Sequence, residues 1–518
     1  MHDHTQYFPS RGEDDRLDVA GILRRRLERE PDREILSFSG DRWTAGRILE
    51  RVIAVQAWLA RGGIGRGDRV AVMLENGPDH VALIYALILM GAVWIPVNTR
   101  LRAAGIEYVL GHARPRLFVC GGAFEKEARR ACEAAGFDGL AGEAALGRAA
   151  APVGAALACA PVEPGDLLCI IYTSGTTGAP KGVLFSHRML RIATESALIV
   201  ADVREGDRLF LWEPLCHIGG AQMLLVPFLV RATLYSVPRF SASRFWDQVA
   251  AGRCTQVHYL GGILDILLRQ PIRPPARHTL RVGWGAGVAK ANWAAVRDGL
   301  GIALRECYGM TEGSSFATLN AEDRPGSIGK ALPWLTVELL DDGDEPVPAG
   351  EPGQIVVSSR VPGTFFSGYL DNPEATREAL RGGRLYTGDM ARADEDGYLY
   401  FVGRRTDSMR IRGENVSAWE IERIALTHPD VEAAAAIGVE SGIGEQDVLL
   451  YVQWRKGRAP TFEGLAAWLG ERLASFQWPR YYAAVERFET TPSERIRKHR
   501  LPRSLEGAWD RLAAVARG

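Results

Sequence analysis

One stretch of the chain, residues 70–97, most limits what the chain can fold into. Val70–Leu74 is a short apolar run, Asp79–Gly91 has the length of a helix, and Ala92–Val97 is again strand-like. A strand, a helix and a second strand in succession build a mostly parallel sheet, so we predict an α/β fold. Further apolar runs of strand length, interleaved with stretches of helical character, occur at residues 117–120, 167–172 and 209–212.

The length of the chain predicts more than one domain. A chain of 518 residues exceeds what a single hydrophobic core usually organises. Near residue 404 the sequence changes from the apolar Tyr398–Val402 to a charged stretch with glycines, and strand-like and helical segments follow. We therefore expect a large N-terminal domain, residues 1–404, with layered, mostly parallel sheets flanked by helices. A small α+β C-terminal domain should occupy residues 405–518.

The composition of the chain excludes several classes of function. The formal net charge is −1, without the basic excess that a nucleic-acid-binding surface requires. The seven cysteines form no CxxC pair and no metal-ligand spacing, which indicates a reducing compartment. The start lacks the pattern of a secretory signal, and the most apolar run, Val81–Met90, is too short to span a bilayer. We expect a cytoplasmic protein without nucleic-acid or membrane partners.

The segment Tyr172–Gly182, YTSGTTGAPKG, has the composition of a phosphate-binding loop. Glycines let backbone N–H groups approach an anion, hydroxyl side chains add donors, and Lys181 adds a positive charge. A P-loop of the Walker type needs a second glycine where this chain has Pro180, so that class is disfavoured. A flexible polar hairpin loop is the alternative, and the segment alone does not decide between the two.

Four further motifs follow this loop along the chain, at Gly283–Gly287, Tyr308–Glu312, Thr387–Asp389 and Gly403–Arg404. Together with the loop, they resemble the motifs of the adenylate-forming superfamily, which contains acyl-CoA synthetases, luciferases and peptide-synthetase adenylation domains. The resemblance extends over nearly the whole chain. Within the superfamily, the chain looks most like acid:CoA ligases of the crotonobetaine/carnitine-CoA ligase-like group, through residues 324–329, 366–369 and 412–417.

The resemblance implies a reaction in two steps. A carboxylate attacks the α-phosphorus of ATP and expels pyrophosphate, and a thiol then attacks the acyl-adenylate and expels AMP. We expect an ATP-dependent acid:CoA ligase that uses ATP, CoA and Mg²⁺ and acts on a small-molecule carboxylic acid. Loading of a separate carrier protein and a catalytically degenerate nucleotide-binding homologue stay open as alternatives. The identity of the acid is left open, and a homodimer is expected from base rates alone.

The resemblance also implies which residues bind the nucleotide. Lys181 would handle phosphate charge, Thr311 would bind the α-phosphate, and Glu312 would be the metal ligand for Mg²⁺. Taken singly, Tyr308 could belong to the core, and Glu312 or Arg404 could be a solvated surface charge. The full set of nucleotide-binding residues is Thr173, Ser174, Gly175, Thr176, Thr177, Gly178, Lys181, Gly285, Ala286, Gly287, Tyr308, Gly309, Met310, Thr311, Asp389 and Arg404.

Two smaller groups of residues are implied to bind the acyl group and CoA. The acyl-binding residues are His217, Tyr259 and Trp284. A lone histidine in an apolar run is more often a hydrogen-bonded core residue, which is the alternative for the first of them. The CoA-binding residues, which would line a pantetheine tunnel in a mobile C-terminal domain, are Arg412, Gly413 and Glu414. The hinge for that domain maps to Thr406.

The C-terminal end departs from the family pattern at a catalytic position. Relatives usually carry Pro-Thr-Gly-Lys-Ile, whose lysine bridges the acyl carboxylate and the α-phosphate during adenylation. Here the sequence is Pro492-Ser-Glu-Arg495-Ile496, and arginine is not interchangeable with lysine at a tight site. Either Arg495 does the work of the lysine, or Lys498 reaches the site, or adenylation is slow. We favour Arg495 as the catalytic group.

Overall fold

The computed structural model describes most of the chain, which divides into two compact units. The first unit contains the residues up to Thr173 together with Pro180–Val337 and Val357–Leu385, and the second contains Glu338–Val356 and the residues from Tyr386 onward. The domain boundary expected at residue 404 stays a prediction. The described residues are 19–101, 103–173, 180–270, 274–275, 277–288, 290–404, 408–411, 414–440, 446–458, 461–473, 475–490 and 496–515.

The strand, helix and strand expected over residues 70–97 are present in the first unit. Strands β3 (Arg69–Met73) and β4 (Val93–Pro96) pair in parallel, and α3 (Pro78–Met90) connects them. All residues of α3 from His80 to Leu89 are buried, which explains why this helix has no polar face. The sheet has the strand order β6-β5-β3-β4-β7-β8. Its other strands are β5 (Leu117–Cys120), β6 (Leu140–Gly142), β7 (Leu167–Thr173) and β8 (Lys181–Ser186).

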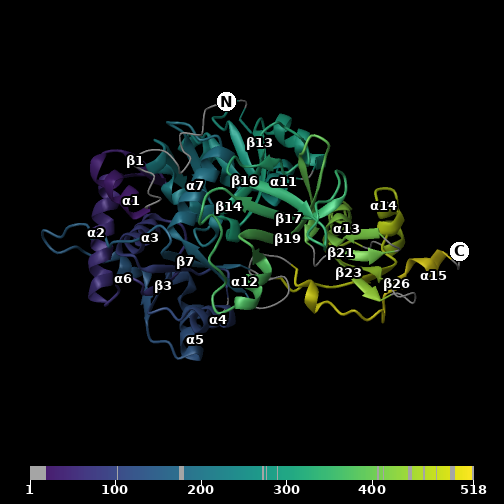
Figure 1. The fold of residues 1–518 in the computed structure, drawn as a ribbon, viewed down its shortest axis with the longest axis horizontal. Helices are drawn as coiled ribbons and strands as arrows, with labels where there is room; N and C mark the ends of the chain where they lie inside the picture. Colours follow the sequence, from purple (N-terminus) through teal and green to yellow (C-terminus); the bar gives the residue numbers. More distant parts are fainter. Residues whose placement is uncertain are drawn as a thin grey trace. The chain divides into compact units, whose positions relative to one another are not determined.

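Several helices of the first unit pack around this sheet. Helices α1 (Val19–Arg29) and α2 (Ala45–Arg61) pack against each other and against α3 (Figure 1). Thr44 caps α2, because its side chain accepts a hydrogen bond from the backbone N–H of Arg47. The remaining helices near this sheet are α4 (Ala103–Ala113), α5 (Glu125–Ala135) and α6 (Glu143–Gly147).

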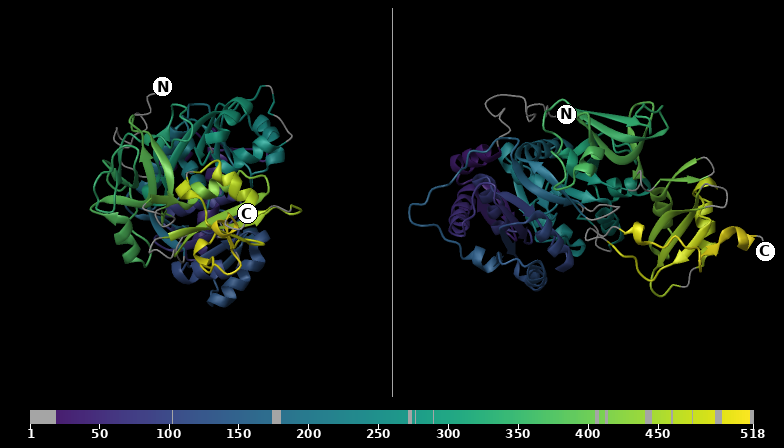
Figure 2. Two further views of the ribbon diagram at one scale, coloured as in Figure 1. Left: turned by 90° about the vertical axis from the view of Figure 1, so that its right-hand side faces the viewer. Right: turned by 60° about the horizontal axis from the view of Figure 1, so that its bottom comes forward.

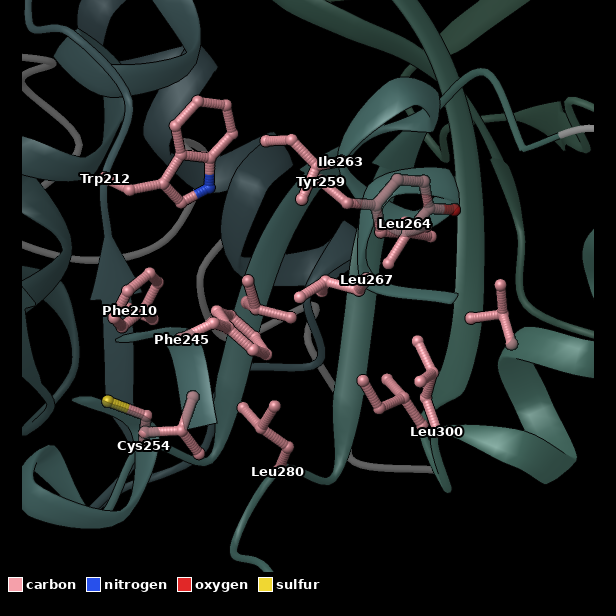
Figure 3. Packing of buried hydrophobic residues seen from close by; sticks show 14 of the residues in the cluster. Phe210, Trp212, Phe245, Cys254, Tyr259, Ile263, Leu264, Leu267, Leu280 and Leu300 are labelled. Atoms are coloured by element: carbon pink, nitrogen blue, oxygen red, sulfur yellow. The ribbon is translucent and has the colours of Figure 1, made fainter. Parts of the chain in front are cut away.

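A second, nine-stranded sheet completes the first unit, with the order β15-β14-β13-β12-β11-β9-β10-β1-β2. Its middle strands, from β10 to β13, are parallel, so their carboxyl ends meet at one edge, where α/β sheets usually bind ligands. One face is covered by a large apolar cluster that contains Phe245 and Tyr259 (Figure 3). The strands are β1 (Glu34–Phe38), β2 (Asp41–Thr44), β9 (Arg208–Leu211), β10 (Thr233–Ser236), β11 (Gln256–Leu260), β12 (Val282–Ala286), β13 (Ala303–Met310), β14 (Ser315–Asn320) and β15 (Lys330–Ala331).

The helices that accompany the nine-stranded sheet are mostly short. The longest, α7 (His187–Val200), is buried at nearly every position and begins at Ser186, whose hydroxyl accepts a hydrogen bond from the N–H of Met189. The others are α8 (Ile218–Ala221), α9 (Val226–Leu229), α10 (Phe245–Gly252), α11 (Gly261–Arg269) and α12 (Pro373–Ala379). Among the described residues, no helix combines the length and the apolar composition needed to cross a membrane.

The second unit has a mixed sheet with the order β23-β24-β25-β26. Helices α13 (Ala418–Ala425) and α14 (Phe462–Gly470) cover one face of it, where Ile421 and Leu465 share a core with Leu450 (Figure 2). A five-stranded sheet is shared by the two units and contains β16 (Leu335–Leu340), β17 (Pro352–Ser359), β18 (Leu380–Arg381), β19 (Arg384–Ala393) and β20 (Leu399–Arg404), of which β18 belongs to the first unit. The other strands of the second unit are β21 (Ser408–Ile411), β22 (Glu414–Ser417), β23 (Val431–Glu440), β24 (Gln446–Trp454), β25 (Tyr481–Ala484) and β26 (Trp509–Asp510). The predicted α/β fold class is confirmed.

Candidate active site

Three residues that are far apart in the sequence meet in the first unit. Lys181 is the first residue of β8, in register with Thr173 across the hairpin formed with β7. Its Nζ lies 5.0 Å from the centroid of the Tyr369 ring. The hydroxyl of Tyr369 donates a hydrogen bond of 2.8 Å to Glu312 Oε1. The predicted phosphate-binding lysine and the predicted metal ligand therefore lie on either side of one aromatic side chain.

The surroundings of Glu312 suit a hard cation. Glu312 is only 5% exposed. Its carboxylate accepts a hydrogen bond from the hydroxyl of Tyr369, and its backbone carbonyl oxygen accepts one of 3.0 Å from the N–H of Phe366. Mg²⁺ prefers oxygen ligands and usually takes most of them from substrate phosphates and water, so one protein carboxylate is sufficient. No group of three or more potential metal-ligating side chains occurs among the described residues. Glu312 thus fits an ion that is bound together with a nucleotide.

The loop after β12 carries the predicted adenine-binding residues. Gly285 has φ +155°, and a Cβ atom placed there would lie 2.0 Å from the carbonyl oxygen of Tyr259. Only glycine fits this close approach of two neighbouring parallel strands. Beyond it, Ala286 and Gly287 are both exposed. The strand therefore ends in a backbone segment that is open to a ligand.

A buried carboxylate holds this loop in place. Glu306 Oε1 accepts hydrogen bonds from the N–H groups of Gly287 at 2.5 Å and Val288 at 3.2 Å, and its Oε2 accepts from the Tyr259 hydroxyl at 2.6 Å. Burial raises the pKa of Glu306 to about 7, although all three donors act in the opposite direction. The sequence analysis did not select Glu306. The available sequence signal for Glu306 was its position two residues before Tyr308, because a polar residue next to a motif often holds that motif in place.

The motif that follows places its residues on β13 and in a tight turn. Tyr308 is 8% exposed and pairs with Thr318 of β14, next to a register shift at Gly309. A Cβ at Gly309 would lie 1.9 Å from the carbonyl oxygen of Ser315, so the strands approach too closely there for any side chain. Met310 ends the strand and is partly buried, and Thr311 is buried.

In the second unit, the two predicted ribose-binding residues occupy opposite positions on two paired strands. Asp389 of β19 is in register with Arg404 of β20. Asp389 is 2% exposed, and its backbone N–H donates to the Thr387 hydroxyl at 3.1 Å. That hydroxyl in turn donates to the carbonyl oxygen of Ile355 at 2.8 Å. The pairing brings together two residues that are separated by a β-turn in the sequence.

The three predicted acyl-binding residues lie in different surroundings. His217 is partly exposed at the start of α8, with its Nε2 3.3 Å from Asn98 Nδ2. Trp284 is buried, and its ring centroid lies 4.3 Å from that of His258. Tyr259 has no exposed surface; its ring belongs to the apolar cluster, and its hydroxyl donates to Glu306 (Figure 3).

Some predicted site residues cannot be placed. Thr173 is described at the end of β7, and Glu414 begins β22 opposite Ile411. The residues that lie outside the described part of the chain are Ser174, Gly175, Thr176, Thr177, Gly178, Thr406, Arg412, Gly413 and Arg495.

Lys498, the alternative to Arg495, is engaged within the second unit. Its Nζ forms an ion pair of 2.8 Å with Glu422 Oε1, and the side chains of both residues are mostly buried. The same carboxylate oxygen accepts a hydrogen bond of 2.6 Å from the backbone N–H of Ala436. Lys498 therefore connects α13 to the segment that follows the predicted catalytic arginine.

Comparisons with known proteins identify the family of this chain. Residues 23–370 match the family described as AMP-binding enzyme, and residues 420–495 match the AMP-binding enzyme C-terminal domain. A crotonobetaine/carnitine–CoA ligase of Escherichia fergusonii is 31% identical over 445 residues, which cover 81% of this chain and 85% of the relative. A sulfoacetate–CoA ligase of Cupriavidus necator is 31% identical over 503 residues, which cover 93% and 97%.

Solved structures give the same result for the fold. ATP-bound MatB from Rhodopseudomonas palustris superimposes with a TM-score of 0.82 at 26% identity, over 93% of this chain and 98% of that protein. The anthranilate CoA ligase AuaEII in complex with anthranoyl-AMP gives 0.82 at 23% identity, over 96% and 98%, and so bears on the fold alone. This chain therefore belongs to the family of AMP-binding enzymes.

Proposed function

We propose that Lys181, Glu312 and Tyr369 form the polyphosphate end of the active site in this chain, which is an ATP-dependent acid:CoA ligase. The enzyme uses ATP, Mg²⁺ and CoA, and it releases AMP and pyrophosphate as it converts a carboxylic acid to its acyl-CoA. The observation that carries the assignment is the meeting of Lys181 Nζ and the Glu312 carboxylate at the ring and the hydroxyl of Tyr369.

The chemistry of adenylation needs this combination of charges. The acid carboxylate attacks the α-phosphorus of ATP, one bond to the bridging oxygen breaks, and pyrophosphate leaves with the negative charge. Lys181 supplies positive charge toward that leaving group. Glu312 supplies an oxygen ligand for Mg²⁺, which neutralises phosphate charge when it is bound. Tyr369 keeps the Glu312 carboxylate fixed by its hydrogen bond.

The remaining nucleotide contacts are proposed for two segments. The backbone of Gly285, Ala286 and Gly287 would contact the adenine, and its exposure and its anchoring by Glu306 support this role. Asp389 and Arg404 would bind the ribose hydroxyls, and their register on neighbouring strands supports a shared target. Thr311 would donate to the α-phosphate from its place beside Glu312.

Arg495 is proposed as the catalytic cation that joins the acyl carboxylate and the α-phosphate. The ion pair between Lys498 and Glu422 supports this choice, since Lys498 would have to give up a mostly buried partner to act instead. Breaking one side of a buried pair leaves an uncompensated charge, which is costly. Arginine keeps the positive charge that the step requires.

Free CoA is proposed as the acyl acceptor, with Arg412, Gly413 and Glu414 in the pantetheine tunnel. The relatives at 31% identity are both named as CoA ligases, and this supports CoA over a carrier protein.

We also propose a cytoplasmic homodimer. All seven cysteines are free and six are buried, which supports a reducing compartment.

The test of the assignment is acid-dependent AMP release with ATP, Mg²⁺ and CoA, screened over short, branched, aromatic, hydroxylated and betaine-type acids. Glu312→Gln should reduce pyrophosphate exchange at least a hundredfold, because it removes the metal-binding charge without changing the shape of the side chain. Glu125→Gln, which removes a carboxylate from an exposed ion pair, is the control and should change nothing. Full exchange activity in Glu312→Gln would refute the assignment.

A further inference from the structure

A buried polar cluster joins one predicted acyl-binding residue, Trp284, to two residues, Glu213 and His258, that have no role in the site described above. Glu213 follows β9, His258 is on β11, and Trp284 is on β12, in register with His258. These strands are neighbours and parallel, so all three side chains come from one stretch of the sheet edge. Edges of this kind are where α/β sheets hold their ligands.

The first part of the cluster is an ion pair. Glu213 Oε1 lies 2.6 Å from His258 Nδ1, and the two side chains are 7% and 8% exposed. The pair sets one acidic side chain against one imidazole, and the carboxylate oxygens of Glu213 are hydrogen-bond acceptors. It therefore offers a hydrogen-bond acceptor to a ligand and no excess positive charge to a second anionic group.

The second part is a donor without an acceptor. The Nε1 of Trp284 is buried and has no hydrogen-bond partner among the described residues, and Trp284 is only 1% exposed. A buried N–H group that makes no hydrogen bond costs free energy, and native proteins rarely tolerate one without a reason. The ring of His258 contacts both other members of the cluster, since its centroid lies 4.3 Å from that of Trp284 and its Nδ1 lies 2.6 Å from Glu213 Oε1.

The cluster is held rigidly by the backbone around it. Asn76 donates to the carbonyl oxygen of Glu213 at 2.7 Å and accepts from the N–H of Leu215 at 3.2 Å, which fixes both sides of the segment. The indole of Trp212 donates to the carbonyl oxygen of His258 at 2.8 Å. A Cβ at Gly219 would lie 2.4 Å from Glu213 Oε1, so the carboxylate packs directly on the helix that follows His217. Groups fixed in this way are pre-organised for recognition.

We infer that this cluster recognises a hydroxyl group on the acyl substrate, which makes the substrate a hydroxy acid. A hydroxyl can donate to the Glu213 carboxylate and accept from the Trp284 N–H at the same time. The inference rests on the proposed function, in which the chain activates a carboxylic acid. Phe316 packs edge-on against Trp284 with 5.8 Å between centroids, so the indole is held between aromatic neighbours.

Acids without the hydroxyl should be rejected strongly. An alkyl acid would cover the Glu213–His258 pair with methylene groups and leave the Trp284 N–H unpaired. Sites built to hydrogen-bond a substrate group discriminate against analogues that lack it far better than apolar pockets do, by roughly 10⁴-fold in favourable cases. A second acid group would meet the charge of Glu213 and should be rejected as well.

The test compares matched pairs of acids in wild-type protein and in two variants. The pairs are glycolate with acetate, 3-hydroxypropanoate with propanoate, and 3-hydroxybutanoate with butanoate, and the measured quantity is the ratio of kcat/KM values within a pair. In the wild type, at least one pair should favour the hydroxy acid by about a hundredfold or more. Trp284→Phe should reduce that ratio roughly tenfold, because it removes the donor to the substrate hydroxyl, and Glu213→Gln should reduce it further.

Trp284→Phe separates recognition from structure. Phenylalanine also leaves a smaller ring at this buried position, so the variant should lose some stability and some rate with both acids of a pair, whereas only the loss of the N–H should lower the ratio between them. A purely structural cluster would instead leave the ratio unchanged in every variant, which would overturn the inference. Glu195→Gln, which removes the negative partner of the buried Arg191–Glu195 pair of α7, is the matched control and should lower stability without changing the ratio.

The outcomes also separate this inference from the proposed function. Acid-dependent AMP release that favours deoxy, trimethylammonium or sulfonated acids would overturn hydroxyl recognition and keep the ligase assignment. No AMP release with any acid, in a protein that is folded by its melting curve, would overturn both.

Discussion

The hydroxyl of Tyr369 lies 2.8 Å from the Glu312 carboxylate and donates a hydrogen bond to it. This contact joins two motifs 57 residues apart, and the same ring lies 5.0 Å from Lys181 Nζ. The predicted metal ligand is therefore oriented by the hydroxyl of Tyr369. Removing the hydroxyl of Tyr369 while keeping its ring should therefore change how tightly the Glu312 carboxylate binds Mg²⁺.

Tyr369→Phe should raise the Mg²⁺ concentration needed for half-maximal pyrophosphate exchange by roughly tenfold, since a hydrogen bond to a charged group contributes about 1.5–3 kcal/mol. Titrating exchange activity with Mg²⁺ measures this. Tyr451→Phe removes a comparable hydrogen bond, of 2.7 Å to the carbonyl oxygen of Pro502, and serves as the control. An unchanged Mg²⁺ dependence in Tyr369→Phe would remove Tyr369 from the site.

Glu306 should make stability depend on pH. Burial raises its pKa from 4.5 to about 7, so between these values the folded protein binds a proton that the unfolded chain has released. The contribution to the free energy of unfolding is therefore largest below about pH 4.5, falls as the pH rises to about 7, and is constant above that. Glu306→Gln should lack this contribution, and urea unfolding of both proteins between pH 5 and pH 8 tests it. Parallel pH dependences would show that Glu306 is not responsible.

Glu306→Gln should also weaken ATP binding at neutral pH. A glutamine has one acceptor oxygen in place of two, so it cannot satisfy the Tyr259 hydroxyl and the loop N–H groups together. We expect the KM for ATP to rise about tenfold while kcat changes less. Equal loss of activity at saturating ATP would indicate damage beyond the loop.

Gly285→Ala should be strongly destabilising. The new Cβ would meet the carbonyl oxygen of Tyr259 at 2.0 Å, and φ is +155°, a conformation nearly restricted to glycine. We expect a loss of about 3 kcal/mol or more in the free energy of unfolding. Gly40→Ala, at φ +90° with nothing within 4 Å, is the control for strain without collision and should cost about 1 kcal/mol. Similar losses for the two would mean that the strands separate easily at Gly285.

Arg495→Ala should abolish most pyrophosphate exchange, whereas Lys498→Ala should leave it intact. Two unit charges about 4 Å apart attract by roughly 4 kcal/mol at an effective dielectric constant of 20, so losing the catalytic cation should cost at least a hundredfold. Lys498→Ala removes the partner of Glu422 and should lower the melting temperature instead. The reverse result, with exchange lost only in the lysine variant, would move the catalytic role to Lys498.

Gly413→Leu should separate the two half-reactions. A bulky side chain in the pantetheine tunnel would block CoA, so pyrophosphate exchange should persist while thioester formation is lost. Measuring both rates on one preparation tests this, and equal loss of both would refute the assigned role.

The order of strands and helices was predictable because apolar periodicity is local. The alternation over residues 70–97 anticipates β3, α3 and β4, and the expected strand at residues 209–212 is shifted by one residue, to Arg208–Leu211. The family and the class of reaction were also predictable, because five motifs in order are specific. These predictions are confirmed by the fold and by the relatives.

The supporting residues were not predictable in the same way. Glu306 reaches Tyr259 and Gly287 across two neighbouring strands, and Tyr369 reaches Glu312 from a separate loop. No local sequence pattern predicts a hydrogen bond between positions that are so far apart in the chain. Tyr259 illustrates the limit: the resemblance implies a contact with the acyl group, which stays a prediction, and no local pattern shows that its hydroxyl donates to Glu306. Glu213 likewise stands out only once His258 is seen beside it.

The strand pair that carries Asp389 and Arg404 has a consequence for turnover. Backbone hydrogen bonds between β19 and β20 link these two positions. The two residues should therefore move together in any conformational change that preserves the sheet. Release of AMP would then require the proposed ribose contacts of Asp389 and Arg404 to break together, so the product would dissociate in a single step.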